Sequence, residues 1–452
     1  MSRDVNPTLM TVPPRLKRAT RPPRGVAPLI ADLEQAAAEG NTDTEVFWER
    51  VERTGTPVVG ELDDQGRRTV TFLWRGGDEL ADVILTADRI AAADSYERNR
   101  MERVPGTDVW HLTYLMRSDW RASYGVAPVP ADGTPAPENA LSATTRTRRE
   151  RALALSDPED RPAVARWFDA LAHARPDPRA REALDAHHSV VSLPEAPPEL
   201  RPGLAPDAPR GTLTRHTLAS ERLGNTRDVW IHRPAREPVD GTWTVAILLD
   251  GRTWHDLPLA PLLDGLIADG TLPPMLTIMV DSLDQATRTR ELACHDPFVD
   301  FLDTELLPWL GALHPVTDDP GRTLIAGQSL GGLTALYAAL RLPGRFGRVL
   351  SQSGSYWWPN PAVTGGETER TVRLVREADA LPERVHLSAG LHEWALLGAN
   401  GRVHEALLER GRELGLPGDF AGFTEYNGGH DKACWRADLP HGLIALTEDH
   451  AR

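Results

Sequence analysis

The sequence predicts an α/β domain with a mostly parallel sheet, preceded by a smaller antiparallel β-sandwich. The chain has 452 residues, about three times the length of a typical domain, so two domains are expected. Between residues 211 and 450, short apolar runs alternate with helical stretches, which favours parallel strands covered on both faces. Between residues 69 and 126, β-rich segments are separated by Gly and Asp turns, which favours antiparallel strands.

Three stretches of the chain differ in composition. Residues 1–28 are rich in Pro and Arg and have no apolar period, so they predict a flexible arm rather than a docking segment for acidic partners. Residues 29–200 are predicted to form the sandwich domain, with a helical connector that starts near residue 128. After a Pro-rich boundary, residues 205–452 are predicted to form the α/β domain.

The spacing of apolar residues gives the expected elements. The sandwich strands are expected at residues 69–75, 80–85, 109–115 and 122–126, with helices at 28–40 and 162–174. The strands of the α/β domain are expected at residues 229–232, 245–249, 275–280, 323–326, 349–352, 385–388 and 423–426. The helices between them are expected at residues 298–310, 332–342 and 402–413.

The composition argues against several classes of function. The formal net charge is −15, which argues against nucleic acid as the main partner because backbone binding needs a basic face. No apolar run reaches membrane length, and the first residues have no apolar signal-peptide core, so we expect a cytoplasmic location without membrane insertion. Cys294 and Cys434 are too few for a disulfide framework or a four-ligand zinc site, and we expect thiols.

The sharpest chemical signal is the stretch Gly327-Gln-Ser-Leu-Gly-Gly332. The pattern G-x-S-x-G alone is weak, but here an apolar strand precedes it and a helix follows it, as in a nucleophile elbow. The glycines permit a tight turn, and the Ser329 hydroxyl is expected at the helix N-terminus. Ser329 is therefore predicted to be a catalytic nucleophile rather than part of an ordinary glycine-rich turn.

A serine nucleophile needs a base, and in such folds the chain order is Ser, acid, His. His430 is the favoured base among the downstream histidines, because it lies in a Gly-rich loop after the expected last strand. Glu393 follows an earlier strand and a Gly-containing loop, so it is the favoured acid to hold the imidazole. Asp431 and Asp281 remain rivals for that role.

Two backbone N–H groups are needed to stabilise an oxyanion. One is expected from Leu330, directly after the nucleophile. The other is expected from the loop that follows the strand at residues 245–249, through Arg252.

With these residues identified, the second half closely resembles the iron(III)-enterobactin (enterochelin) esterases, a branch of the esterase-D-like α/β-hydrolases. The resemblance covers roughly residues 210–450. Residues 69–126 are similar more loosely to the immunoglobulin-like N-terminal domain of that family. The matching stretches are LLDG and the following Trp254, DSLDQATRTRELAC, AGQSLGG, SQSGSYWWP, AGLHE and GGHDKACW, with VTFLWRG and PGTDVWHLTY in the first half.

The resemblance implies hydrolysis of a cyclic catecholate-ester siderophore, usually with iron bound, inside the cell. Ser329 and His430 align with the family's catalytic pair, and Glu393 matches its proposed acid, although related esterases can work with a Ser–His pair. Leu330 departs from the family, which often has an aromatic residue there. Iron is expected to arrive with the substrate, so we expect neither a cofactor nor a protein-held metal; no metal-binding motif is present in the sequence.

A ferric tris-catecholate is a trianion with flat faces, so guanidinium groups and aromatic rings are expected around it. These residues lie in loops expected at the carboxyl edge of the sheet, where α/β proteins bind ligands. The alternative is that the tryptophans pack in the core and the arginines solvate loops. The candidates are Arg252, Arg288 and Arg290 with Trp254, Trp357, Trp358, Trp394 and Trp435.

Two other functions remain open from the sequence. One is an esterase for another bulky ester, because the elbow and base define the reaction type and not the substrate. The other is a binding protein whose sandwich captures a siderophore or carbohydrate beside an inactive hydrolase half. All proposed catalytic groups lie beyond Gly211, so the chemistry is expected not to need the sandwich. The sequence leaves the oligomeric state open.

Overall fold

The computed structural model describes residues 22–87, 90, 96–137, 140–202, 209–257, 259–360 and 369–448. Most of the expected flexible arm, residues 1–21, lies outside these ranges. For its last residues the prediction was wrong, because Pro23 and Gly25 pair with a sandwich strand. The amide of Leu115 donates to the Pro23 carbonyl at 2.9 Å, and the Gly25 amide donates to Thr113 at 3.1 Å.

The chain divides into two compact units. The hydrolase unit comprises residues 199–426 and residues from 435 onward, and the sandwich unit extends to residue 198. The expected boundary near residues 200–205 therefore lies close to the observed one. Residues 427–434 differ from the expectation, because their contacts assign them to the sandwich unit.

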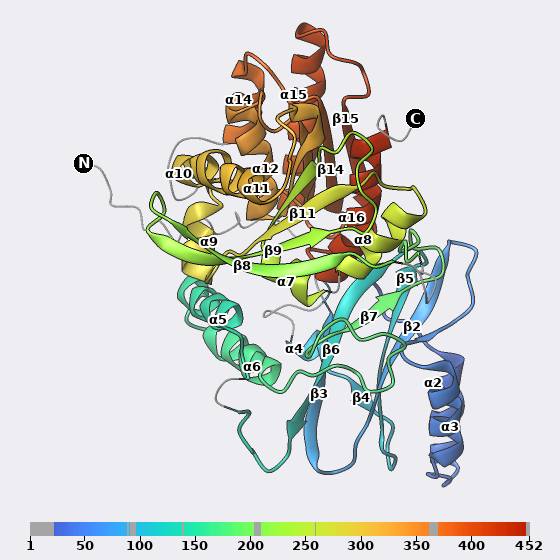
Figure 1. The fold of residues 1–452 in the computed structure, drawn as a ribbon. Coiled ribbons are helices and arrows are strands. Elements are labelled where there is room, and N and C mark those ends of the chain that lie inside the picture. Colours follow the sequence, from blue (N-terminus) through green and yellow to red (C-terminus); the bar gives the residue numbers. More distant parts are fainter. Residues whose placement is uncertain are drawn as a thin grey trace. The chain divides into compact units, whose positions relative to one another are not determined.

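The hydrolase unit contains an eight-stranded sheet in the order β15-β14-β13-β12-β10-β11-β9-β8 (Figure 1). Strands β10 to β15 run parallel, and β9 and β8 add an antiparallel edge. The strands are β8 (Thr212–Ser220), β9 (Asn225–Arg233), β10 (Thr244–Leu249), β11 (Met275–Val280), β12 (Thr323–Gln328), β13 (Arg348–Gln352), β14 (Arg384–Gly390) and β15 (Ala421–Tyr426).

The seven strands expected in this unit are confirmed, and their apolar sequences explain why. Every residue of the central strands β10, β11 and β12 is buried, as expected for parallel strands covered on both faces. Strand β8 was not predicted, because its residues are mostly polar and exposed. Such a sequence is typical of an edge strand, which must avoid pairing with other chains.

Helices cover both faces of the sheet. One face packs in a single apolar core against helices α10, α11, α12, α14 and α15. Helix α16, labelled in Figure 1, contributes to the opposite face. There, Gly442 lies against Leu350 of β13. The helices are α7 (Gly251–Asp256), α8 (Leu259–Ala268), α9 (Gln285–Glu291), α10 (Asp296–Phe301), α11 (Leu307–Leu313), α12 (Leu330–Arg341), α14 (Arg370–Glu377), α15 (Ala395–Glu413) and α16 (Lys432–Thr447).

The expected helix at 298–310 is present but not uniform. A π-helical turn, Leu302–Leu306, separates α10 from α11, and Pro308 stands in the first turn of α11. Proline has no N–H to donate, so the regular hydrogen-bond pattern must change just before it.

The sandwich unit has a four-stranded sheet, β1-β2-β5-β4, and a three-stranded sheet, β3-β6-β7. All of its strand pairs are antiparallel, and one buried cluster lies between the sheets, with Phe72 packed edge-on against Tyr124 at 5.0 Å. The strands are β1 (Val58–Val59), β2 (Arg67–Arg75), β3 (Leu80–Ala87), β4 (Glu102–Arg103), β5 (Val109–Arg117), β6 (Arg121–Pro130) and β7 (Ser189–Ser192).

The remaining predictions concern the helices of the sandwich unit. The expected helices at 28–40 and 162–174 correspond to α2 (Pro28–Ala38) and α6 (Arg161–Leu171). Helix α5 (Ala143–Leu155) was missed; it carries four arginines and starts at Ser142, whose hydroxyl accepts from the Thr145 amide at 3.1 Å. The unit also contains α3 (Glu45–Thr54) and α4 (Tyr96–Asn99). In the described part of the chain, no helix has the length and apolar character needed to cross a membrane.

Candidate active site

Ser329 stands at a strained turn between β12 and α12, which is the strand–turn–helix setting that the sequence predicted. Its backbone angles are φ 59° and ψ −118°, a region that L-residues rarely occupy and that is typical of nucleophile elbows. The turn requires glycine on both sides. A Cβ on Gly327 would lie 2.4 Å from the Gly331 carbonyl carbon, and one on Gly332 would lie 2.6 Å from the Ser351 hydroxyl.

Hydrogen bonds fix the half-buried serine in this turn. The Ser329 amide donates to the Gln352 carbonyl at 3.0 Å, and its carbonyl accepts from the Ser355 amide at 2.9 Å. Its hydroxyl lies 3.2 Å from that of Ser355. Because Ser329 caps the N-terminus of the 12-residue helix α12, the helix dipole stabilises negative charge that develops there.

The two residues expected to supply oxyanion N–H groups both lie near helix N-termini. Leu330 is the first residue of α12, and Arg252 is the second residue of α7. Because β10 and β12 are neighbouring parallel strands, the helices that follow them start at the same edge of the sheet. The arrangement is compatible with an oxyanion hole, and the assignment stays a prediction.

A partly buried ion pair holds the turn before Arg252. Asp250 has a left-handed backbone, φ 58°, and its carboxylate accepts two bonds from Arg288, at 2.7 and 2.6 Å. Arg288 also lies 3.4 Å from the Gln328 carbonyl, one residue before the nucleophile. Although burial acts to lower it, the Asp250 carboxylate raises the pKa of Arg288 above its ordinary value. Sequence reasoning expected a ligand contact from Arg288 and missed Asp250.

Glu393 is fully buried, with no exposed surface. Its carboxylate accepts from the Ser353 hydroxyl at 2.6 Å and from the Gly390 amide at 2.7 Å. The Tyr426 hydroxyl lies 3.4 Å away, and the Trp435 indole N–H donates to Ser353 at 2.9 Å. Tyr426 and Trp435, which belong to the same unit as Glu393 and border residues 427–434 in the sequence, are thus both part of the hydrogen-bond network around Glu393.

His430 belongs to the segment that the contacts assign to the sandwich unit, whereas Ser329 and Glu393 belong to the hydrolase unit. Its role as the base stays a prediction. The rival Asp431 has both carboxylate oxygens bonded to backbone, one to the Ser123 amide and one to the Ala433 amide. These contacts give Asp431 a structural task.

The other rival, Asp281, follows β11. Burial raises its pKa above the ordinary value, although Arg252, 3.8 Å away, acts in the opposite direction. Its backbone amide donates to the Asp228 carbonyl at 3.0 Å. Asp281 is therefore part of a charged cluster with Arg252 and Asp228, and Glu393 remains the favoured acid.

Each arginine expected to bind an anion has a carboxylate partner. Arg252 pairs with Asp228 at 3.3 Å and lies over the Trp230 ring at 5.1 Å. Arg290 pairs with Glu291 at 3.8 Å, and 57% of its side chain is exposed. Arg290 has the most accessible charge of the three, whereas only 21% of the Arg288 side chain is exposed.

The expected tryptophan surface divides into two groups. Trp254, Trp357 and Trp358 are buried, and the last two pack in the main core of the hydrolase unit. Their burial supports the packing alternative, since little of each ring is accessible to a ligand. Trp394 and Trp435 are half-exposed and lie beside Glu393 and Ser353 respectively. Contact with a ligand stays a prediction for these two.

Ser353 and Ser355 are site residues that sequence reasoning did not single out. Both lie in the stretch SQSGSYWWP, and Ser353 has a left-handed backbone, φ 52°. Cys294 and Cys434 both remain thiols. Within the ranges that the structure describes, no group of three or more His, Cys, Asp or Glu side chains is placed to hold a metal ion.

Comparisons with known proteins agree with this geometry. Residues 220–446 match the family described as "Putative esterase", and residues 69–201 match "Enterochelin esterase, N-terminal". An iron(III) enterobactin esterase from Dickeya dadantii is 36% identical over 88% of this chain and 92% of the relative. An iron(III) salmochelin esterase from Escherichia coli is 29% identical over 92% of this chain and 97% of the relative.

Solved structures show the same similarity. The enterobactin esterase from Shigella flexneri, determined in the presence of enterobactin, has 31% identity and a TM-score of 0.72. That match covers 90% of this chain and 98% of the other. The ferric enterobactin esterase from Salmonella typhimurium has 31% identity and a TM-score of 0.73, covering 90% of this chain and all of the other. The expected fold class is confirmed, and this chain, a carboxylic ester hydrolase, belongs to the family of the iron(III) enterobactin esterases.

Proposed function

We propose that this chain hydrolyses the ester bonds of a ferric catecholate siderophore lactone, such as enterobactin, in the cytoplasm. The observation that carries the proposal is the strained Ser329 elbow, held at φ 59° between a buried strand and a helix N-terminus. Relatives at 36% and 34% identity bear the name iron(III) enterobactin esterase, which supports this substrate class.

In the proposed reaction, Ser329 attacks a lactone carbonyl while His430 takes the serine proton. The N–H groups of Leu330 and Arg252 stabilise the tetrahedral oxyanion. As it collapses, the ester C–O bond breaks, and His430 returns the proton to the leaving alkoxide. Water, deprotonated by His430, then hydrolyses the acyl-enzyme and regenerates Ser329. Glu393 holds the imidazole in the productive tautomer.

Iron is part of the substrate in this scheme, and the protein needs no cofactor of its own. Opening the trilactone weakens its hold on iron, which favours later reduction and release of the metal. A trianionic substrate also has to approach a chain of net charge −15. Local cations such as the exposed Arg290 are suited to offset that repulsion.

The direct test is chromatography of the products after incubation with ferric and iron-free enterobactin. Linear catecholate products are expected from the wild type and none from Ser329→Ala. A fluorophosphonate probe should label the wild type at Ser329, because that reaction requires an activated serine. Labelling without siderophore hydrolysis would indicate an esterase for another bulky ester. Siderophore binding without labelling would indicate a binding protein. Fractionation of producing cells tests the cytoplasmic location.

A further inference from the structure

The segment that carries His430 is attached to the sandwich unit on both sides of the histidine. Before it, the Asn427 carbonyl accepts from the Arg121 amide at 3.0 Å. After it, the Asp431 carboxylate accepts from the Ser123 amide. Further along, the Cys434 thiol donates to the Arg121 carbonyl at 3.4 Å. Three successive anchors thus fix a segment that contains no regular structure before α16.

The partner of this segment is one edge of strand β6. The register of β3 with β6 ends at the pair Ala87 and Tyr124, so residues 121–123 have β7 on one side only. Alternate backbone groups of a strand point to opposite sides. The groups of Arg121 and Ser123 that point away from β7 are those bonded to residues 427–434, so the segment occupies a strand edge whose polar groups need partners.

A side-chain contact adds a fourth anchor at the turn between β5 and β6. The side-chain amide of Asn427 donates to the Asp119 carboxylate at 2.6 Å. Asp119 also accepts two bonds from Arg117, at 2.7 and 2.6 Å. Although burial acts to raise it, the bonds from Arg117 and Asn427 hold the pKa of Asp119 below its ordinary value. The acceptor is therefore ionised at neutral pH.

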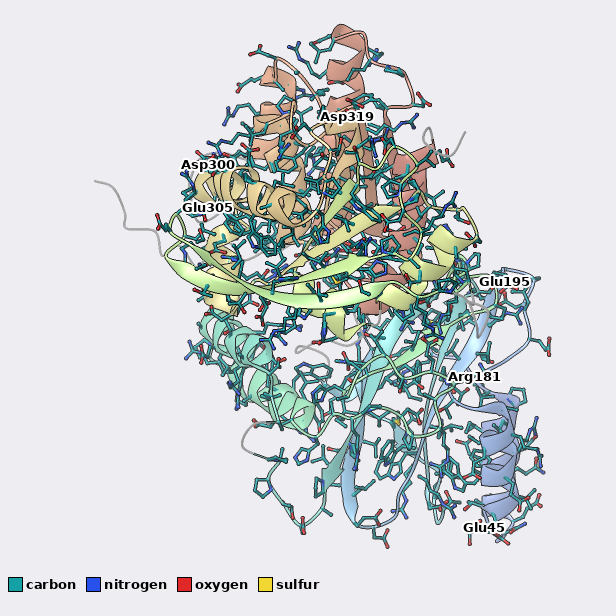
Figure 2. All side chains as sticks on the ribbon, in the orientation of Figure 1. Glu45, Arg181, Glu195, Asp300, Glu305 and Asp319 are labelled. Atoms are coloured by element: carbon teal, nitrogen blue, oxygen red, sulfur yellow. The ribbon has the colours of Figure 1, made fainter. Side chains whose placement is uncertain are left out.

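The turn itself is braced by the sandwich. Glu195, labelled in Figure 2, accepts from the Ser118 hydroxyl and pairs with Arg68 of β2 at 2.8 Å. Its own amide donates to the Ser118 carbonyl at 3.1 Å. The turn that carries Asp119 is thus bonded to residue 195, which in turn pairs with β2.

We infer that Asp119 and the Arg121–Ser123 edge of β6 are positioning elements for His430, so that the sandwich unit controls the rate of ester hydrolysis for every substrate. The inference rests on the proposed function, in which His430 is the base. A base that is displaced by about 1 Å can lose about 100-fold in rate. Residues 427–431 have no regular structure, so they depend on contacts to keep their place, and the sandwich supplies three of these contacts. Cys434, at the start of α16, adds the fourth.

The test uses the full-length chain with Asp119→Ala, a neutral activated ester and ferric enterobactin. We expect kcat to fall about 10- to 100-fold on both substrates, with KM nearly unchanged, because the anchor touches neither substrate. Hydrogen exchange should become faster in residues 427–434. Asp119→Asn retains an acceptor oxygen for Asn427 and should recover most of kcat.

Asp78→Ala is the matched control. Asp78 also lies in a turn of the sandwich unit and pairs with an arginine, Arg103, at 2.6 Å, but this turn joins β2 to β3 and does not contact the His430 segment. The kcat of this variant should stay within about twofold of wild type. If Asp119→Ala does not fold, Asn427→Ala removes the same bond from the other side and should give the same fall in kcat.

His430→Ala separates the two hypotheses. If this variant retains activity, His430 is not the base, and the proposed function fails first. If it is inactive while folded Asp119→Ala keeps wild-type kcat and unchanged exchange in residues 427–434, the positioning role is overturned. A fall in kcat that Asp78→Ala shows equally would also overturn it, because general loosening of the sandwich would then explain the loss.

Discussion

The Ser329 elbow and the His430 segment position the predicted nucleophile and the predicted base by different physical means. The elbow is compact in the sequence: a buried strand, close-packed glycines and a helix start hold the serine, and its bonded partners Gln352 and Ser355 lie no more than 26 positions away. The His430 segment depends on residues 308 positions away in the sequence, including Asp119 and Ser123. A predicted nucleophile can thus be held by one motif, whereas the segment that carries its predicted base has contacts with another folding unit.

The largest expected effect tests whether the two regions serve one reaction. Ser329→Ala and His430→Ala should each lower kcat by about 10⁴-fold or more, and the double variant should lose no more than either single one. The reason is that a nucleophile without its base, or a base without its nucleophile, leaves only the oxyanion donors. Single-turnover kinetics on an activated ester measures all three. Losses that multiply in the double variant would mean that the residues act independently.

Glu393→Gln should have the next largest effect, a fall in kcat of about 10²- to 10³-fold. The amide matches the carboxylate in size, and the Gly390 and Ser353 donors can still bond to its oxygen. What it loses is the negative charge that stabilises the imidazolium. Substrate affinity should not change.

The two rivals are tested by Asp281→Asn and Asp431→Asn. A slow Asp431→Asn alone would not reassign the acid, because this change also removes an acceptor for the Ser123 or Ala433 amide. An unaffected Glu393→Gln together with a slow Asp281→Asn would reassign the acid. Full activity in all three variants would point to a Ser–His pair that needs no acid.

Gly327→Ala should break the elbow without touching a reacting atom. Its Cβ would lie 2.4 Å from backbone at Gly331, so the turn must open and move Ser329. We expect a fall in kcat of about 100-fold and a loss of stability of about 1–3 kcal/mol. Gly344→Ala is the matched control, because nothing lies within 4 Å of its added Cβ. Equal thermal unfolding and activity in both variants would contradict the close-packing argument.

The sequence predicted the features that depend on neighbouring residues. Apolar runs gave seven of the eight sheet strands, and G-x-S-x-G beside a strand gave the Ser329 turn. It could not predict strand β8, because this edge strand is mostly polar and exposed. Without a buried face, a strand shows no alternation of apolar and polar residues. The contacts of residues 427–434 with strand β6 span some 300 residues, so they leave no local pattern in the sequence either. The expectation that the chemistry does not need the sandwich stays a prediction, which the Asp119 variants test.

Residue type alone does not reveal partners that are distant in the sequence. Arg288 was expected to face a ligand, and the left-handed turn at Asp250 also presents a carboxylate to it. Its contact with a ligand stays a prediction. Trp357 and Trp358 lie in a stretch that closely resembles the family, yet both rings are buried in the core. A motif identifies which residues matter, whereas burial decides whether they touch a ligand or hold the fold.

The smallest expected effect is that of reversing the charge of Arg290. It is compared with the same change at Arg288, two residues away on α9. Arg288→Glu would place two carboxylates together at Asp250 beside the elbow. It should therefore lower kcat on a neutral activated ester as well as on the ferric substrate, and lower the melting temperature. Arg290 is 57% exposed, so Arg290→Glu should leave the neutral ester untouched.

For the trianionic ferric substrate, Arg290→Glu should raise KM about two- to fivefold at low salt, because an attraction worth at most about 1 kcal/mol becomes a repulsion. Added salt should remove most of that difference, since exposed charges are screened beyond about 10 Å at 0.1 M. The measurement is KM for both substrates at low and high ionic strength. Equal KM in variant and wild type at low salt would remove Arg290 from the anion site. An Arg288→Glu variant with normal neutral-ester turnover would return Arg288 to it, because the Asp250 turn would then not depend on the pair.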